Sequence, residues 1–308
     1  MEIDSIETIR ALDPKGLLRT FTSKNTRPSA RQHVAARPTS VVHSVLPRNT
    51  YGSSLVRFGD TKVLGAVTLS VGVPGPATPD EGDVVVAVTV GPICGRGYNL
   101  SGRIIEGEGG AHADVGEGGK VAASRADPSS IESHLQRVLR TSGLIDLKSL
   151  GLVSAKAAWR LNVNCVVLND GGNLFDAGLV GCISALTDTR LPRTRVDDAA
   201  NTDEGMIRVV SGDDPNVCGS GGVKLKLNMK HLPIPLTIGI FEDALLVDPD
   251  DEEERVLDGT LTLIVNSFGG IVSMDKRGKT NMSAEKLAAC VHMARGRAKE
   301  LEGVIKMS

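Results

Sequence analysis

The acidic run from Asp248 to Glu254 is the densest group of side chains that could do chemistry, because every residue in it except Pro249 carries a carboxylate. Clustered carboxylates can hold a divalent cation or act as general acid and general base. Charge runs of this kind are more often solvated loops between two strands, and we predict that form here. A metal or acid–base site is the alternative interpretation.

Two glycine-rich segments could cradle phosphate, but neither has the complete motif. The segment Gly116–Lys120 ends in Gly-Lys, but Val121 stands where a phosphate loop needs Ser or Thr, and Asp114 occupies its first-glycine position. The segment from Gly95 to Leu100 lacks the third glycine of a dinucleotide fingerprint. The histidines are isolated from any serine or cysteine nucleophile, so no triad is expected. We predict a long flexible loop over about residues 95–126.

Composition and charge narrow the class of protein. The chain has 308 residues, 41% of them hydrophobic, and a net charge of −2, so any nucleic-acid binding must come from a local basic patch. The five cysteines form no CxxC pair and no zinc-ligand spacing, which favours reduced, buried thiols. The N-terminus is acidic where a signal peptide needs positive charge, and no apolar run is long enough to span a membrane. We expect a soluble, intracellular protein with no metal and no cofactor.

The elements that would position these residues follow from the hydrophobic period. Apolar residues at helical spacing predict an N-terminal helix broken at Pro14, within a segment of helix and arginine-rich linker that covers residues 1–38. Alternating β-branched residues from Thr39 to Val90, separated by turn residues, predict an antiparallel meander. A helix is expected over Ser129–Thr141, after the long loop.

A strand over residues 157–168 is expected to turn at Gly171-Gly172 into a helix capped by Asn173. Small residues in that helix, Gly178 and Gly181 among them, predict that another backbone approaches it closely. The polar stretch over residues 193–222 has little periodicity and is interpreted as a linker.

A second set of strands begins at about residue 223, and an amphipathic helix follows an N-cap at Ser283. The order of strands, helices, strands and helix predicts an α+β fold with two similar halves. The first half covers residues 39–192 and the second covers residues 223–308, each with a mixed or antiparallel sheet packed on helices.

Four motifs in this order resemble the family of RNase PH-type proteins. They are the strand pair Gly52–Leu64, the strand-to-helix turn Asp170–Ala177 with its Asn-Leu-Phe-Asp-Ala spelling, the hairpin from Leu245 to Thr262, and the closing helix from Leu287. Together they span most of the chain. Within the family, the chain is most similar to the non-catalytic ring subunits of the eukaryotic RNA exosome.

The resemblance implies an RNase PH-like fold and a set of partners. The expected partners are other RNase PH-like ring subunits, RNA-binding cap subunits, an associated processive ribonuclease and single-stranded RNA, with no membrane. The resemblance also implies a location in the nucleus, the nucleolus and the cytoplasm. The implied function is in RNA processing and degradation, including the maturation of ribosomal RNA.

The sequence departs from the pattern of the family's active members, which use inorganic phosphate to cleave RNA from its 3' end. Those members hold phosphate with an Arg-Ser-x-Glu segment, where this chain reads Asp127-Pro128-Ser129-Ser130-Ile131-Glu132. They carry Thr-Arg at the strand-to-helix turn, where this chain has Asn173-Leu174. Their second aspartate follows the acidic run, where Gly259-Thr260-Leu261 stands, although Asp258 is one step away. The missing cationic groups for phosphate predict an inactive homologue with no catalytic residues.

Two rival functions remain open from the sequence. An active phosphate-dependent 3'-to-5' exoribonuclease is the first, and the missing arginines speak against it. A small-ligand binder with a glycine-rich lid is the second, and the incomplete phosphate-loop motifs speak against that one.

Four arginines are the candidates for contact with RNA. Arg96 and Arg103 lie near the mouth of the predicted loop, and Arg137 and Arg140 lie on the helix after it. The resemblance implies that this region faces the central channel of a ring. Solvated arginines or ordinary ion pairs are the alternative interpretation.

Overall fold

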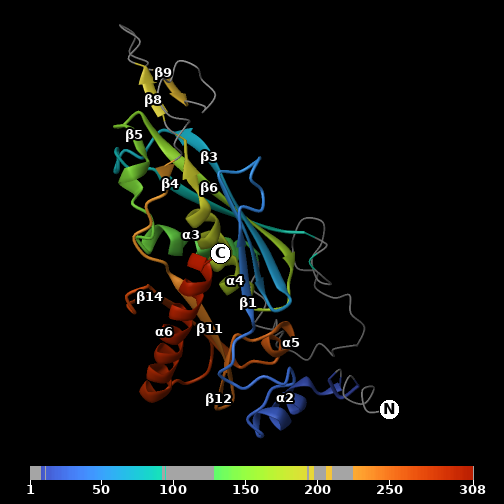
Figure 1. The fold of residues 1–308 in the computed structure, drawn as a ribbon. Helices are drawn as coiled ribbons and strands as arrows, with labels where there is room; N and C mark the ends of the chain where they lie inside the picture. Colours follow the sequence, from blue (N-terminus) through green and yellow to red (C-terminus); the bar gives the residue numbers. More distant parts are fainter. Residues whose placement is uncertain are drawn as a thin grey trace, which may run out of the picture.

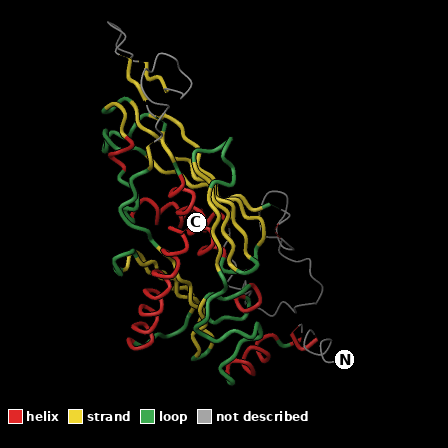
Figure 2. The backbone as a smooth tube through the Cα atoms, in the orientation of Figure 1, coloured by secondary structure: helices red, strands yellow, loops and turns green. Residues whose placement is uncertain are grey.

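The computed structural model describes residues 8–10, 12–91, 94, 128–192, 194–197, 206–209 and 225–307. The predicted loop over residues 95–126 and the cysteine at position 218 lie outside these ranges. Two main sheets with helices packed on them form the described structure (Figure 1). Figure 2 shows them as two separate groups of strands. The predicted α+β class is confirmed.

The first sheet has the strand order β1-β2-β3-β6-β4, with the short β5 also paired to β6. Its strands are β1 (Thr39–His43), β2 (Gly52–Phe58), β3 (Thr61–Gly72), β4 (Asp83–Val90), β5 (Gly151–Val153) and β6 (Ala157–Asn169). The predicted meander is confirmed for β1, β2 and β3, which pair antiparallel.

The meander prediction is wrong for β4. This strand pairs in parallel with β6, which lies between β3 and β4. Strand period shows which side chains share a face, but it carries no information on which strand will be the neighbour.

Helices α3 (Pro128–Thr141) and α4 (Leu174–Asp188) pack on the first sheet. The predicted close approach to α4 is confirmed: the Ser54 hydroxyl donates to the Gly181 carbonyl at 2.9 Å, and a Cβ on Gly65 would stand 2.6 Å from that oxygen. Glycine at position 65 is therefore required for the sheet and helix to meet at this distance.

In the segment over residues 193–222, which is predicted to be a linker, the described residues form short strands. The segment contains a two-stranded ribbon of β8 (Thr194–Asp197) and β9 (Met206–Val209), and short strands β7 (Arg190–Leu191) and β10 (Leu225–Lys226) pair on either side of it. Strands of two to four residues leave too short a hydrophobic pattern to detect in a sequence.

The second sheet has the strand order β12-β11-β13-β14, with all pairs antiparallel. Its strands are β11 (Ile234–Phe241), β12 (Ala244–Val247), β13 (Gly259–Val265) and β14 (Ile271–Gly278). The closing helix α6 (Ala284–Met307) packs on β11 and β13, and the Ser283 hydroxyl accepts from the Lys286 N–H, so the predicted N-cap is confirmed.

Residues 8–10 and 12 are helical and Asp13 is not, so the predicted break of the N-terminal helix at Pro14 is confirmed, and Pro14 begins a second helix. It is the first residue of α2 (Pro14–Thr22), and the Asp13 side chain caps the helix by accepting from the Gly16 N–H at 2.8 Å. Proline suits this position because its missing N–H would have no partner there. Leu18 of α2 packs with Phe241, Leu246 and Val256, so the N-terminal segment docks on the second half (Figure 1).

Two further sequence predictions can be checked in the described residues. Cys94, Cys165, Cys182 and Cys290 are free and buried, as expected. A search of the described helices finds none with the length and apolar character that a membrane crossing needs.

Candidate functional site at the junction of the two halves

The acidic run is not a solvated loop, because its first residue is enclosed by an arginine. Asp248 is 2% exposed, and both of its carboxylate oxygens accept hydrogen bonds from the Arg37 side chain, at 2.8 Å and 3.0 Å. The Arg37 backbone N–H also donates to Asp248 at 2.8 Å. The remaining guanidinium donors reach the carbonyls of Gly171 and Gly172 at the strand-to-helix turn. Arg37 thus joins the N-terminal segment to both halves.

Asn173 belongs to the same cluster instead of capping α4. Its backbone has φ 51° and ψ 47°, and its side chain makes no cap hydrogen bond. Its Nδ2 donates to Asp248 at 2.7 Å and to Asp176 at 2.9 Å. Asp176 in turn accepts from the backbone N–H and the hydroxyl of Thr237 on β11. The predicted cap position is therefore right, but the side chain links α4 to the second sheet.

A second buried arginine holds the other end of the acidic run. Arg27 is 0% exposed and donates to both carboxylate oxygens of Glu253, at 2.9 Å and 2.7 Å, as well as to the Val247 carbonyl at 2.7 Å. The short helix α5 (Asp251–Glu254) begins with a capping box in which Asp250 and Glu253 exchange hydrogen bonds. The run is thus folded around two arginines, and we call Arg27, Arg37, Asp248 and Glu253 the junction clamp.

The carboxyl groups of this region titrate very differently. Burial favours neutral Asp248, but Arg37 and Asn173 outweigh it and lower the pKa of Asp248 to about 2. Burial raises the pKa of Asp176 to about 6, against the opposing hydrogen bonds from Asn173 and Thr237. Burial also raises the pKa of Glu254 to about 8, although this group accepts a hydrogen bond from the Asn173 N–H. The clamp therefore fixes a charged Asp248 beside two carboxyls that are easily protonated.

The arrangement is poorly suited to holding phosphate or a metal. No group of three or more metal-ligating side chains occurs among the residues that the structure describes. Leu174, at the position where the resemblance expects a cation, is 8% exposed and part of the apolar core. Glu132, in the segment that aligns with the family's phosphate-binding one, accepts from the Val88 backbone N–H on β4. The charged groups of the junction clamp bind one another, and the Asn173 Oδ1 is the polar atom there that is buried without a partner among the described residues.

Asp258, the alternative candidate for a second catalytic aspartate, lies at the far end of the β11–β12 hairpin from Asp248. Its carboxylate accepts from the Glu242 N–H in the turn at 2.9 Å and is exposed. It closes a turn and takes no part in the junction cluster.

The four arginines predicted to contact RNA fall in two groups. Arg96 and Arg103 lie outside the described residues. Arg137 is exposed on α3. Arg140 is exposed too, but it donates to the Val84 carbonyl on β4 and forms an ion pair with Asp83.

Arg140 is the last of three α3 side chains that cover the outer edge of β4. Glu132 accepts from the Val88 N–H, and Gln136 accepts from the Val86 N–H and donates to the Val84 carbonyl. Spaced four residues apart on one helix face, these side chains satisfy backbone groups that an edge strand leaves open. Arg140 therefore has a structural role that its spacing alone did not reveal.

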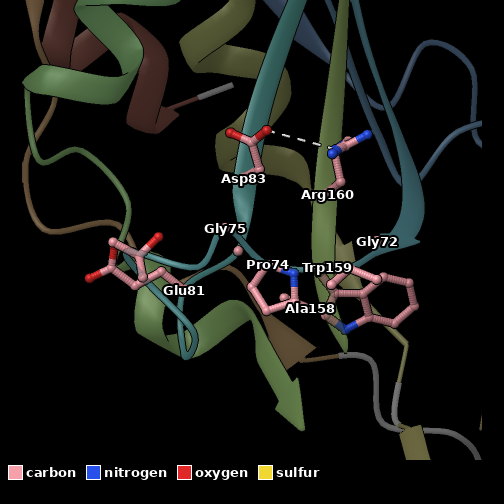
Figure 3. A pocket seen from close by; sticks show the side chains of 11 residues that line it. Gly72, Pro74, Gly75, Glu81, Asp83, Ala158, Trp159 and Arg160 are labelled. Carbon is pink, nitrogen blue, oxygen red and sulfur yellow. Dashed lines mark ion pairs between the residues drawn. The ribbon is translucent and has the colours of Figure 1, made fainter. Parts of the chain in front are cut away.

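A cavity of about 330 Å³ lies beside this edge, lined by the ends of β3 and β6 and by the turn before β4. Figure 3 shows two residues of its lining, Asp83 and Arg160, pointing toward one another from neighbouring strands. The guanidinium of Arg160 lies 3.7 Å from the Asp83 carboxylate, which Arg140 also contacts. The Arg160 side chain is 46% exposed. It is a further basic group in this region, besides the arginines of α3, that the sequence analysis did not predict.

Comparisons with known proteins identify the family of the chain. Family models described as "3' exoribonuclease family, domain 1" and "domain 2" match residues 35–192 and 231–297. The chain is similar to Exosome complex component Rrp42 of Methanosarcina acetivorans, with 28% identity over 82% of this chain and 79% of that protein. It is 27% identical to Rrp42 of Methanopyrus kandleri over 99% of each. RRP45B of Arabidopsis thaliana is 28% identical over 83% of this chain and 52% of its own length.

Solved structures share the fold. One described as "archaeoglobus fulgidus exosome with RNA bound to the active site" superposes with a TM-score of 0.72 at 23% identity, covering 94% of this chain and 96% of that one. One described as "Archaeal exosome core" gives 0.70 at 23% identity, covering 99% and 100%. The first family model alone spans more than half of the 308 residues. The chain therefore belongs to the 3' exoribonuclease family and has the two-domain RNase PH fold.

Proposed function

We propose that this chain is a non-catalytic subunit of the core ring of an RNA exosome. In that role it supports 3'-to-5' RNA processing and degradation, including maturation of ribosomal RNA, by assembling the ring and guiding RNA through its channel. Membership of the 3' exoribonuclease family supports this, as do relatives at 27–28% identity that are named exosome complex components.

One observation carries the non-catalytic part of the proposal. The Asn173 side chain, at the turn where active members carry Thr-Arg, donates to Asp248 and Asp176, so it stabilises the protein's own carboxylates and not an incoming phosphate. Leu174 beside it is apolar and buried. An oxyanion needs fixed cationic or N–H donors aimed at the charge that develops during reaction. The turn of this chain lacks such donors, which speaks against the rival function, an active phosphate-dependent exoribonuclease.

The partners follow from the same proposal. They are RNase PH-like sibling subunits, RNA-binding cap subunits, a processive ribonuclease and single-stranded RNA, in the nucleus, nucleolus and cytoplasm. Among the ring subunits, the sequence motifs favour the type of ribosomal RNA-processing protein 43. The relatives reported above carry the names Rrp42 and RRP45, so that finer assignment stays a prediction.

For RNA, we propose contacts by Arg96, Arg103, Arg137 and Arg140, with Arg137 as the best of the described candidates. Arg137 is exposed and has no ion pair among the described residues, whereas Arg140 is held by Asp83 and Val84. Arg137→Ala in the assembled complex is expected to weaken binding of all single-stranded RNA sequences alike. The slope of log affinity against log salt should become shallower by about 0.7 for each phosphate that the variant no longer binds.

A titration of labelled oligoribonucleotide at several salt concentrations measures this slope. Arg48→Ala is the matched control, because Arg48 is also exposed but lies on the loop between β1 and β2. Arg96→Ala combined with Arg103→Ala tests the other pair in the same way. A salt slope and affinity that stay at wild-type values in all these variants would remove the arginines from the RNA path.

A further inference from the structure

Besides the three-residue β5, which pairs only with β6, the two main sheets have four outer strands: β1, β4, β12 and β14. An outer strand leaves alternate backbone N–H and C=O groups unpaired, and those groups attract another strand unless something covers them. The side chains of Glu132, Gln136 and Arg140 cover β4, as described above.

Two more outer strands are met by other parts of the chain. The Val247 N–H of β12 donates to the His33 carbonyl at 2.8 Å, and the Val247 carbonyl accepts from Arg27. Helix α6 lies against β1: its Arg297 donates to the Thr39 hydroxyl at 2.6 Å, and the Ile305 carbonyl is 3.0 Å from the His43 ring.

The outer backbone groups of β14 have no such hydrogen bonds among the described residues, although His134 of α3 lies 4.0 Å from the Asp275 carboxylate. Within the described part of the chain, the backbone of β14 bonds only to β13 and within itself. It lies at the outer margin of the second sheet (Figure 1). Ile271 and Met274 are 49% and 54% exposed, and Phe268, in the turn that leads into the strand, is 82% exposed. An eight-residue outer strand with exposed apolar side chains is a ready template for strand addition.

The charge of this edge indicates which kind of strand it accepts. Lys276, Arg277 and Lys279 are exposed at its far end, and Asp275 is the one carboxylate of the strand. Asp275 is already paired with Arg277 at 3.2 Å. A β-bulge beside Ile264 and Val265 disturbs the pairing at the other end, near Val272. Exposed lysines and bulges are devices that discourage identical edges from pairing, so a second copy of this chain is disfavoured.

We propose that β14 is a docking edge for an extended segment of a neighbouring ring subunit, which adds a strand to the second sheet. The segment carries apolar side chains opposite Ile271 and Met274 and carboxylates opposite Lys276 and Arg277. Opposite charges directly across two strands stabilise the pair, while main-chain hydrogen bonds supply most of the affinity. This inference rests on the proposed ring function and specifies one of its contacts.

Hydrogen exchange of the backbone amides tests the inference directly. The chain is co-expressed with its RNase PH-like siblings, the mass of the complex is measured, and exchange is compared with that of the free chain. Amides of residues 271–278 are expected to exchange at least about tenfold more slowly in the complex, because strand addition gives the outward-facing groups new partners. Amides of residues 83–90 are the internal control, since β4 is already covered, and their exchange should stay the same.

The outcomes separate this inference from the function on which it rests. A complex of ring mass in which residues 271–278 exchange as in the free chain would overturn the docking edge and leave the proposed function standing. Failure to form any complex with the siblings would overturn the proposed function and the inference with it. Protection of residues 271–278 in a dimer of the chain alone would show a second copy at the edge and overturn the choice of partner.

A charge-reversal pair tests the chemistry of the partner. Lys276→Glu with Arg277→Glu is expected to weaken assembly about tenfold, because it places like charges across the new strand pair. Lys24→Glu with Lys299→Glu changes net charge equally at exposed sites on other elements and should have little effect. Thermal unfolding of each variant checks that the fold is kept. Equal weakening by both pairs, or by neither, would contradict the assignment of an acidic strand.

Discussion

Arg37→Met is expected to lower the free energy of unfolding by about 3–5 kcal/mol, because it leaves the Asp248 carboxylate buried without its cation. Three of the hydrogen bonds that Asp248 accepts come from Arg37, and the Arg37 side chain supplies two of them. The same substitution also frees the carbonyls of Gly171 and Gly172. Chemical denaturation of the purified chain, followed by circular dichroism, measures the change.

Arg57→Met is the matched control, because Arg57 is exposed and, among the described residues, its side chain hydrogen-bonds only to the nearby Gly59 carbonyl. Substitutions of that kind usually change stability by less than about 0.5 kcal/mol. Similar destabilisation by Arg37→Met and Arg57→Met would contradict the clamp.

The ion pair between Arg37 and Asp248 also predicts a pH dependence of stability. The pKa of Asp248 is lowered from 3.8 to about 2, so its contribution to stability is present above pH 3.8 and is lost as pH falls toward 2.

The second large effect concerns catalysis: the purified chain is expected not to shorten an oligoribonucleotide when inorganic phosphate is added. Its rate should fall at least about a thousandfold below that of an active family member, because several fixed donors for the transferred phosphate are missing at once. The measurement is release of nucleoside diphosphates from labelled RNA, with and without phosphate. An active RNase PH-type enzyme under the same conditions serves as the positive control.

Rapid phosphate-dependent release of nucleoside diphosphates that disappears in an Asp248→Asn variant would assign catalysis to this chain. The folded state of that variant must be checked by circular dichroism, since Asp248 also holds the clamp. Release that persists in the variant would instead indicate a contaminating nuclease.

Local features of the fold could be predicted from the sequence, because the evidence for each lies within one segment. The closing helix follows from apolar residues three or four apart after Ser283, and the approach of the Gly65 backbone to α4 follows from the small Gly181. Helix α3 begins at Pro128, one residue before the predicted start. Each of these predictions needs only the spacing of apolar residues along the sequence and the size of the side chains.

The site itself could not be predicted in the same way, because its contacts join distant residues. Arg37 and Asp248 are 211 positions apart, and Arg27 and Glu253 are 226 apart. Each arginine precedes a proline in a polar stretch, which is why the sequence favours a linker there. A buried arginine and a solvated one look identical in a single sequence. The acidic run likewise looks exposed, because its cationic partners lie in another part of the chain.

The central claim is that this chain works as one member of a ring of RNase PH-like subunits. Co-expression with its siblings, followed by native mass measurement of the purified complex, tests it most directly. We expect one copy of this chain in a closed six-membered ring of related subunits, and poor solubility or non-specific oligomers when it is expressed alone. A clean monomer that stays single over a wide range of concentration and does not bind those siblings would contradict the claim.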